Sequence, residues 1–291
     1  MQFLQVLIGG LSQGFIYGLI ALGFVLIYKA TEAVNFAQGD IMMLGAFCGL
    51  LFAAHFGMPY WVALLLAVAV LAAFGFGTEM LVLRPVLGQP GFALIMITIG
   101  VGLLARGLIT MIPGVGADTH ALDAPYKGAV LTMGQLVIGM EHVVIIVASV
   151  AICALLYLMF RFTRLGIAMQ AVSQNQLAAY YMGIPVKRLN SLVWALSAAV
   201  ATIAGVLLAP LAFVHANIGF IGLKAFPAAV IGGFESLPGA TAGGLIIGVV
   251  EALAGFYLPE GFKDVAAYVV VLVMLVIKPN GLFGQTIRKR V

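Results

Sequence analysis

The sequence predicts an all-α protein made of one domain, residues 1–291, that crosses a membrane many times. Of its residues, 64% are hydrophobic and only 8% are charged, and the mean hydropathy is +1.18. Soluble domains carry about 25% charged residues, so the chain belongs in a lipid bilayer. Apolar runs near the ~20 residues that a spanning helix needs recur along the sequence. The few cations lie scattered at the ends of these runs, so no nucleic-acid-binding surface is expected.

Nine apolar segments predict eight or nine membrane spans. They cover residues 3–28, 41–56, 61–83, 92–112, 137–160, 189–213, 220–234, 240–258 and 265–279. The segments 220–234 and 265–279 are short for a span. Short segments interrupted by Gly or Pro indicate broken or re-entrant helices that line a protected interior.

The first segment carries Gly10, Gly14 and Gly18 at intervals of four residues. This spacing places three small residues on one helix face, which allows a neighbouring backbone to approach closely. We interpret the pattern as ordinary membrane packing. The segment is followed by a polar stretch that contains Asn35, Gln38 and Asp40. These residues are candidates for helix caps, with Asp40 capping the second span, or for the lining of a path.

Two charged residues lie inside apolar segments, Arg106 in the fourth and Glu251 in the eighth. A charge at the centre of a membrane helix costs about 2.5–3.5 kcal/mol even on the lenient scale, so such groups face protein or water. Their opposite signs suggest that they pair with each other. The alternative for Arg106 is that its side chain reaches an interface.

The stretch from Lys224 to Gly239 resembles a helix with a break, because Pro227, Gly232, Gly233 and Pro238 interrupt it. Backbone groups released by Gly and Pro must be satisfied inside protein or by water. We expect this stretch, with Phe226, Gly232, Gly233 and Glu235, to line or gate a path.

The longest charged interruption is residues 161–188, which contain a short helix of their own. Ser173 and Gln176 have the spacing of a capping box, and Gly183 and Pro185 would end the helix. Its ~15 Å are too short to cross a bilayer core of roughly 30 Å. The apolar residues Leu177, Tyr181 and Ile184 follow helical spacing. Either the helix lies in the membrane interface, or it docks a soluble partner.

The cations predict the orientation. Lys29, Arg84, the 161–188 stretch, Lys278 and residues 288–290 fall on one side if the nine segments alternate. Cations near membrane spans mark the cytoplasmic side, which predicts an external N-terminus and a cytoplasmic C-terminus. The sequence has no P-loop, no G-x-S-x-G nucleophile motif and no H-E-x-x-H zinc motif, so a membrane enzyme is poorly supported. No metal site is expected.

Several stretches resemble one family in order along nearly the whole chain. They are GGLSQGFIYGLIALGFVLIYKATEAVNFAQGD, LRP at 83–85, FTRLGIAMQAVSQNQLAAYYMGI, AGVLLAP, GLKAFPAAVIGGFESLPGATAGGLIIGVVEAL and KPNGLFG. The chain resembles the permeases of ABC importers for branched-chain amino acids, the LivH type. Two departures stand out: Gln38 and Asp40 replace the usual His and Glu, and Gln174 replaces an acidic residue.

The resemblance implies a type II ABC importer permease in the bacterial inner membrane. Its partners would be two cytoplasmic ABC ATPase subunits, which use ATP and Mg, a second permease subunit that is commonly a related chain, and a periplasmic or lipid-anchored binding protein. This chain itself would need no cofactor. The short helix would be the coupling helix, whose docking residues are Gln174, Asn175, Leu177, Ala178, Tyr181, Met182, Gly183 and Ile184.

The function expected from the sequence is therefore half of an ATP-driven path for branched-chain or hydrophobic amino acids. Relatives of this type also move other amino acids, amides and urea. A stand-alone channel or secondary carrier is the alternative from a different class, although Arg106 and Glu251 are few ionisable groups for a carrier.

Overall fold

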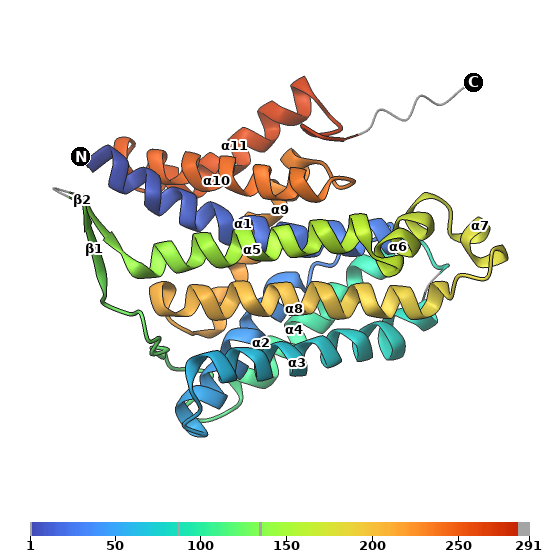
Figure 1. Ribbon diagram of the computed structural model, residues 1–291, viewed down its shortest axis with the longest axis horizontal. Coiled ribbons are helices and arrows are strands. Elements are labelled where there is room, and N and C mark those ends of the chain that lie inside the picture. Colours follow the sequence, from blue (N-terminus) through green and yellow to red (C-terminus); the bar gives the residue numbers. More distant parts are fainter. Residues whose placement is uncertain (1, 87, 134–135, 285–291) are drawn as a thin grey trace.

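The computed structural model describes residues 2–86, 88–133 and 136–284, and it is a bundle in which most of the long helices run along one common direction (Figure 1). The long helices are α1 (Gln2–Thr31), α2 (Gln38–Leu50), α3 (Tyr60–Thr78), α4 (Gly91–Thr110), α5 (Met140–Phe162), α8 (Val186–Ala212) and α10 (Leu237–Tyr257). The shorter ones are α6 (Arg164–Gln174), α7 (Gln176–Tyr181), α9 (Ile221–Gly232) and α11 (Phe262–Ile277). The expected all-α class is confirmed.

Among the described residues, seven helical stretches are long and apolar enough to cross a membrane. Two of them continue beyond their α-helix, because π-helical turns extend α2 over Leu51–His55 and α3 over Glu79–Leu83, and a 3₁₀ turn, Arg84–Val86, follows the latter. The two segments that looked short in the sequence are the helices α9 and α11. A 3₁₀ turn at Ala216–Phe220 leads directly into α9.

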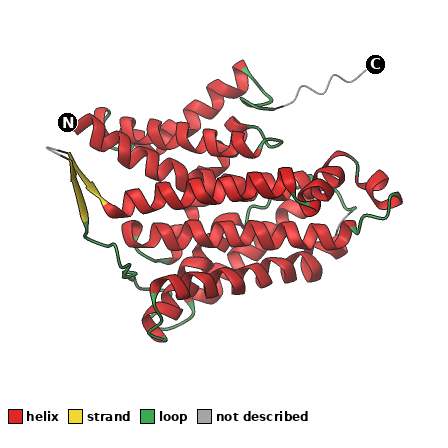
Figure 2. Ribbon diagram, in the orientation of Figure 1, coloured by secondary structure: helices red, strands yellow, loops and turns green. Residues whose placement is uncertain are grey.

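The segment expected to begin as a helix at residue 137 begins as a strand instead. Val130–Met133 (β1) and Leu136–Gly139 (β2) form an antiparallel hairpin in which Val130 pairs with Gly139 (Figure 2). Apolar, β-branched residues suit a strand as well as a membrane helix, so hydrophobicity alone did not separate the two. Helix α5 starts one residue after the hairpin ends.

Helix α1 is the centre of the bundle, and its glycine face packs on α10. A Cβ placed on Gly14 would lie 2.9 Å from the carbonyl oxygen of Gly244 and 2.9 Å from the Cα of Leu245. Gly10 and Gly18 are likewise crowded by α10. Only residues without a side chain allow backbones to come this close. The interpretation of these glycines as packing residues is confirmed.

The helices α2 and α9 both begin inside the bundle. Gln38, the first residue of α2, lies beside Gly23 of α1, eight residues or about 12 Å before that helix ends at Thr31. Residues 32–37 therefore re-enter the bundle without helical structure. The N-terminal turn of α2 meets that of α9, because Gly39 and Gly222 touch through their backbones. Non-helical chain at this depth is tolerated only within protein or beside water.

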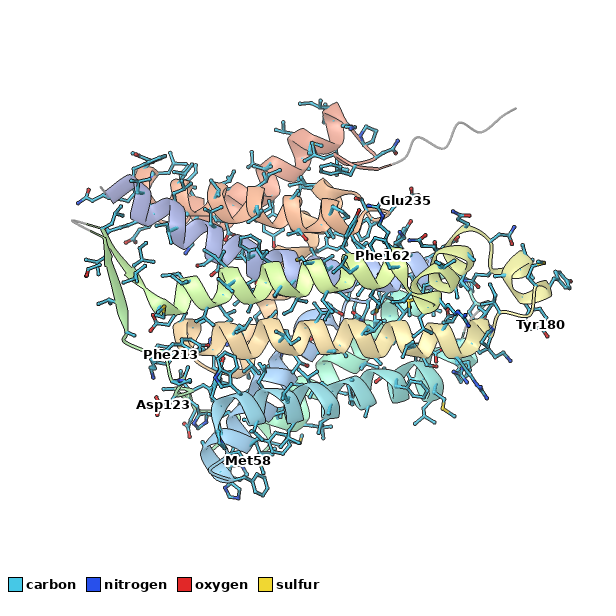
Figure 3. All side chains as sticks on the ribbon, in the orientation of Figure 1. Met58, Asp123, Phe162, Tyr180, Phe213 and Glu235 are labelled. Atoms are coloured by element: carbon cyan, nitrogen blue, oxygen red, sulfur yellow. The ribbon has the colours of Figure 1, made fainter. Side chains whose placement is uncertain are left out.

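The end of the bundle that carries α7 lies opposite the Gln2 end of α1 (Figure 1), and several cations gather there. Lys29 and Arg161 line one pocket there, and Arg84 donates a hydrogen bond to the carbonyl of Lys187. Figure 3 labels Tyr180 and Glu235 towards this end and Met58 and Asp123 towards the other. We call the end with α7 the basic end.

Candidate functional site

The helix α7 projects from the basic end, and its outer surface is apolar (Figures 1 and 3). The exposed fractions of Leu177, Tyr181 and Met182 are 70%, 82% and 83%, and Tyr180 is exposed as well. Gln174, Asn175, Ala178 and Gly183, also expected at a docking surface, are exposed too. An apolar surface that stands clear of the bundle is suited to contact with another protein.

The start of α7 differs from the expected capping box. Asn175 is the cap, since its side-chain oxygen accepts a hydrogen bond from the N–H of Ala178 at 2.9 Å. Ser173 instead donates to the carbonyl of Gln170 within α6. The capping box was wrong because α6 and α7 are two helices, with Asn175 in an extended conformation between them. The end was predicted correctly, with Gly183 at φ +82°.

The inner side of α7 fixes it to the bundle. Ala179 is buried in a cluster that includes Ile27 and Val193, and Ile184 packs against the same cluster. Gln176 donates a hydrogen bond of 2.7 Å to the carbonyl of Ala30 at the end of α1. Ile184 is therefore an anchoring residue and not part of the exposed face that the helical spacing suggested. Force applied to α7 would reach both α1 and α8.

An ion pair lies where α2, α4 and α9 meet. Arg106 donates to one carboxylate oxygen of Asp40 from Nη2 at 2.6 Å and from Nε at 3.1 Å. Its guanidinium lies 4.0 Å from the centre of the Phe220 ring. The exposed fractions of the Arg106 and Asp40 side chains are 17% and 14%. This finding corrects two predictions, because Arg106 does not pair with Glu251 and Asp40 does not cap α2.

The amides of the re-entrant stretch form a buried network beside this pair. Asn35 donates to Gln38, and Gln38 and Ser197 of α8 bond to each other. Asn35 also accepts from the N–H of Ala37, which makes it a local cap as expected. Phe36 uses its N–H to reach Thr98 of α4. The stretch is thus tied to α4 and α8, and the backbone N–H groups of Phe36 and Ala37 both have partners, as burial requires.

A file of half-buried aromatic rings extends from the ion pair towards the basic end. The rings of Phe36 and Phe226 have centroids 5.6 Å apart, and Phe226 and Phe234 follow at 5.8 Å. Tyr28 continues the file, 4.8 Å from Phe234. We call these four residues the aromatic file. Of these four residues only Phe226 was expected from the sequence, although Phe36 beside Asn35 and Phe234 beside Gly233 carried a usable signal.

Glu251 belongs to a different network. It accepts a hydrogen bond from Tyr17 of α1 and lies 3.4 Å from the ammonium of Lys224. Lys224 also contacts Asp264 of α11 at 2.6 Å. The network joins four helices, α1, α9, α10 and α11. The cationic partner Lys224 compensates for the charge of the buried Glu251 carboxylate. Because its members come from four helices, the network holds these helices together.

The remaining residues of the expected break lie at the basic end. Gly233, at φ +93°, ends α9, and the turn to α10 brings Gly232 against Gly239. The two helices therefore form a tight antiparallel pair rather than one interrupted span. Residues 281–284 cross beneath them, with Leu282 donating to the carbonyl of Ile231 at 2.7 Å. Glu235 is exposed in the turn (Figure 3).

A family model and several known permeases match this chain over nearly its whole length. The family model described as "Branched-chain amino acid transport system / permease component" matches residues 6–278. The LivH permease protein of a high-affinity branched-chain amino acid transport system in Salmonella typhimurium is 31% identical, over 98% of this chain and 96% of that protein. BraD of Pseudomonas aeruginosa is 30% identical over 98% and 96%. A probable LivH of Methanocaldococcus jannaschii is 29% identical over 98% and 94%. The chain belongs to the family of permease components of branched-chain amino acid transport systems.

Proposed function

We propose that this chain is the membrane subunit of an ATP-driven importer and forms half of a path for branched-chain or other hydrophobic amino acids. The observation that carries the proposal is α7, a short capped helix with an exposed apolar surface and an anchored inner side. A permease component whose own sequence contains no P-loop would need separate ATPase partners to be driven by ATP, and α7 is the surface that would receive them.

The proposed partners follow from this arrangement. Two ABC ATPase subunits, which use ATP and Mg, would bind α7 of this chain and the corresponding helix of a second permease. By the positive-inside rule, the basic end would face the cytoplasm from a bacterial inner membrane, and the C-terminus is expected on the same side. A periplasmic or lipid-anchored binding protein would deliver substrate to the opposite end.

Movement of α7 would be transmitted along two routes. Pro185 and Val186 lead directly into α8, and the bond from Gln176 reaches the end of α1. The two helices meet at the start of α2, because the hydroxyl of Ser197 on α8 bonds both to the carbonyl of Gly23 on α1 and to the side chain of Gln38. Tilting them would shift residues 32–37, which include Phe36, and the ion pair relative to Phe226 and Phe234. This coupling provides a physical route from ATP hydrolysis to alternating access.

The proposed path runs over the Asp40–Arg106 pair and the aromatic file. A zwitterionic amino acid carries one charge of each sign, which the pair can balance, and an apolar side chain, which aromatic rings can contact. The helix N-termini at this point also favour a carboxylate. Asn35, Gln38 and Phe226 belong to this part of the path. The remaining predicted residues would not line this path directly. Gly232, Gly233 and Glu235 lie at the turn between α9 and α10, and Glu251 helps to hold the surrounding helices together.

Co-purification with the ATPase subunits tests the proposal. The Tyr181→Asp, Met182→Asp double variant places two charges on the exposed side of α7 and leaves the anchoring residues unchanged. We expect loss of ATPase association with normal folding of the permease. Tyr257→Asp is the matched control, because it charges an exposed aromatic residue at the other end of the chain's helices.

Two results would contradict the proposal. The first is ATPase association that survives the double variant. The second is uptake of branched-chain amino acids by vesicles that contain this chain without ATPases, which would favour a stand-alone channel or carrier. Competition of uptake by amides, urea and other amino acids distinguishes the substrate classes within the importer family.

A further inference from the structure

A polar pocket lies at the basic end between α1, α5, α6 and the turn before α10. Its volume is about 280 Å³. Among the described residues, its charged lining consists of Lys29, Arg161 and Glu235. Ser236 and Gln170 add polar groups. Two cations and one carboxylate leave a single net positive charge, which is complementary to one phosphodiester group.

An apolar groove of about 450 Å³ continues from this pocket into the membrane-spanning part. Tyr157, Leu237 and Pro238 line both the pocket and the groove. On α5 the groove extends from Tyr157 back to Val150, or about 10 Å at 1.5 Å per residue. That length is a large part of one leaflet, since a whole hydrocarbon core measures roughly 30 Å.

The charges alone would not identify a site. Lys29 and Arg161 each lie in the last turn of a helix, where the helix dipole also favours a cation. The shape supplies the independent observation, because a polar pocket at one end of an apolar groove matches a molecule with an anionic head and an acyl chain. Basic pockets between membrane helices on the cytoplasmic side are suited to lipid headgroups.

We propose that the pocket and groove together bind one anionic phospholipid of the leaflet at the basic end. The phosphodiester would lie between Lys29 and Arg161, where Arg161 is already oriented by a hydrogen bond of 2.6 Å to Tyr157. One acyl chain would lie in the groove between α5 and α10. The lipid would thereby join the end of α5 to the turn between α9 and α10. This inference goes beyond transport and does not depend on ATPase coupling.

Native mass spectrometry of the full-length protein in detergent, with added phosphatidylglycerol or phosphatidylcholine, tests the proposal. We expect preferential retention of one phosphatidylglycerol. The Lys29→Gln, Arg161→Gln variant should weaken it roughly 25-fold, at about fivefold for each cation near a membrane surface. Arg164→Gln with Arg188→Gln is the matched control, because it removes two exposed cations of the same end that do not line the pocket.

A second pair of variants tests the groove without changing a charge. Ala154 lines the groove, and Ala151, on the same helix, is exposed outside it. Ala154→Phe should displace the lipid, whereas Ala151→Phe should not. Three results would overturn the proposal. They are equal retention of the two lipids, unchanged phosphatidylglycerol binding in the Lys29→Gln, Arg161→Gln double variant, and displacement of phosphatidylglycerol by inorganic phosphate at equal concentration. The last result would indicate a site for free anions.

Discussion

The ion pair between Asp40 and Arg106 allows a quantitative test of how the interior is held together. Asp40→Asn removes the carboxylate and leaves the guanidinium of Arg106 with only the Phe220 ring as a described partner. Breaking a buried pair in this way costs about 3–5 kcal/mol. The side chains keep 17% and 14% exposure, so we expect the lower value, about 3 kcal/mol.

Arg106→Gln should cost less, about 2 kcal/mol. The carboxylate of Asp40 that remains lies in the first turn of α2, where the helix dipole favours a negative charge. The double variant leaves neither charge unpaired. We therefore expect it to be about as stable as Arg106→Gln alone, which gives a coupling free energy of about 3 kcal/mol between the two positions.

Thermal unfolding of the four proteins in detergent measures this cycle. Each kcal/mol shifts Tm by roughly 2–4 °C in chains of comparable size, so Asp40→Asn should lower Tm by about 6 °C or more. Asp123→Asn is the control, because it breaks an exposed pair with Lys127 and should leave Tm unchanged. Additive effects at positions 40 and 106, or coupling of Arg106→Gln with Glu251→Gln, would refute the assigned pairing.

Two further predictions concern packing and capping. Gly14→Val should destabilise the protein by about 1–3 kcal/mol or more in the same unfolding assay, because its Cβ would meet the backbone of α10. Gly9→Ala, on the same helix but with no described atom within 4 Å of the added Cβ, should be neutral or slightly stabilising. Asn175→Ala should cost about 1 kcal/mol of local helix stability and speed hydrogen exchange over residues 176–181. Ser173→Ala should leave hydrogen exchange over these residues unchanged. Equal effects of the two substitutions would mean that Ser173 caps the helix after all.

Much of the candidate site was predictable where the signal is local in the sequence. A polar stretch between two apolar runs marked Asn35, Gln38 and Asp40 as candidates for helix caps or for the lining of a path, and the structure places these residues inside the bundle. Gly183 ended the short helix as predicted because a positive φ suits a residue without a Cβ. The inward packing of Ile184 was not predictable, because it depends on a hydrophobic cluster that α1 and α8 supply.

The sequence by itself determined the all-α membrane class, the glycine face of α1 and the clustering of cations at one end. These properties follow from composition and from helical spacing, which act within single segments. Only the tertiary structure decided the partners of Arg106, Glu251 and Glu79. Glu79 is buried in the π-helical extension of α3 and accepts hydrogen bonds from Arg84 and Ser191. Pairing depends on how deep each helix begins and how it is rotated, and α2 begins about 12 Å inside the bundle. No pattern within one segment specifies that depth, because it results from packing against the other helices.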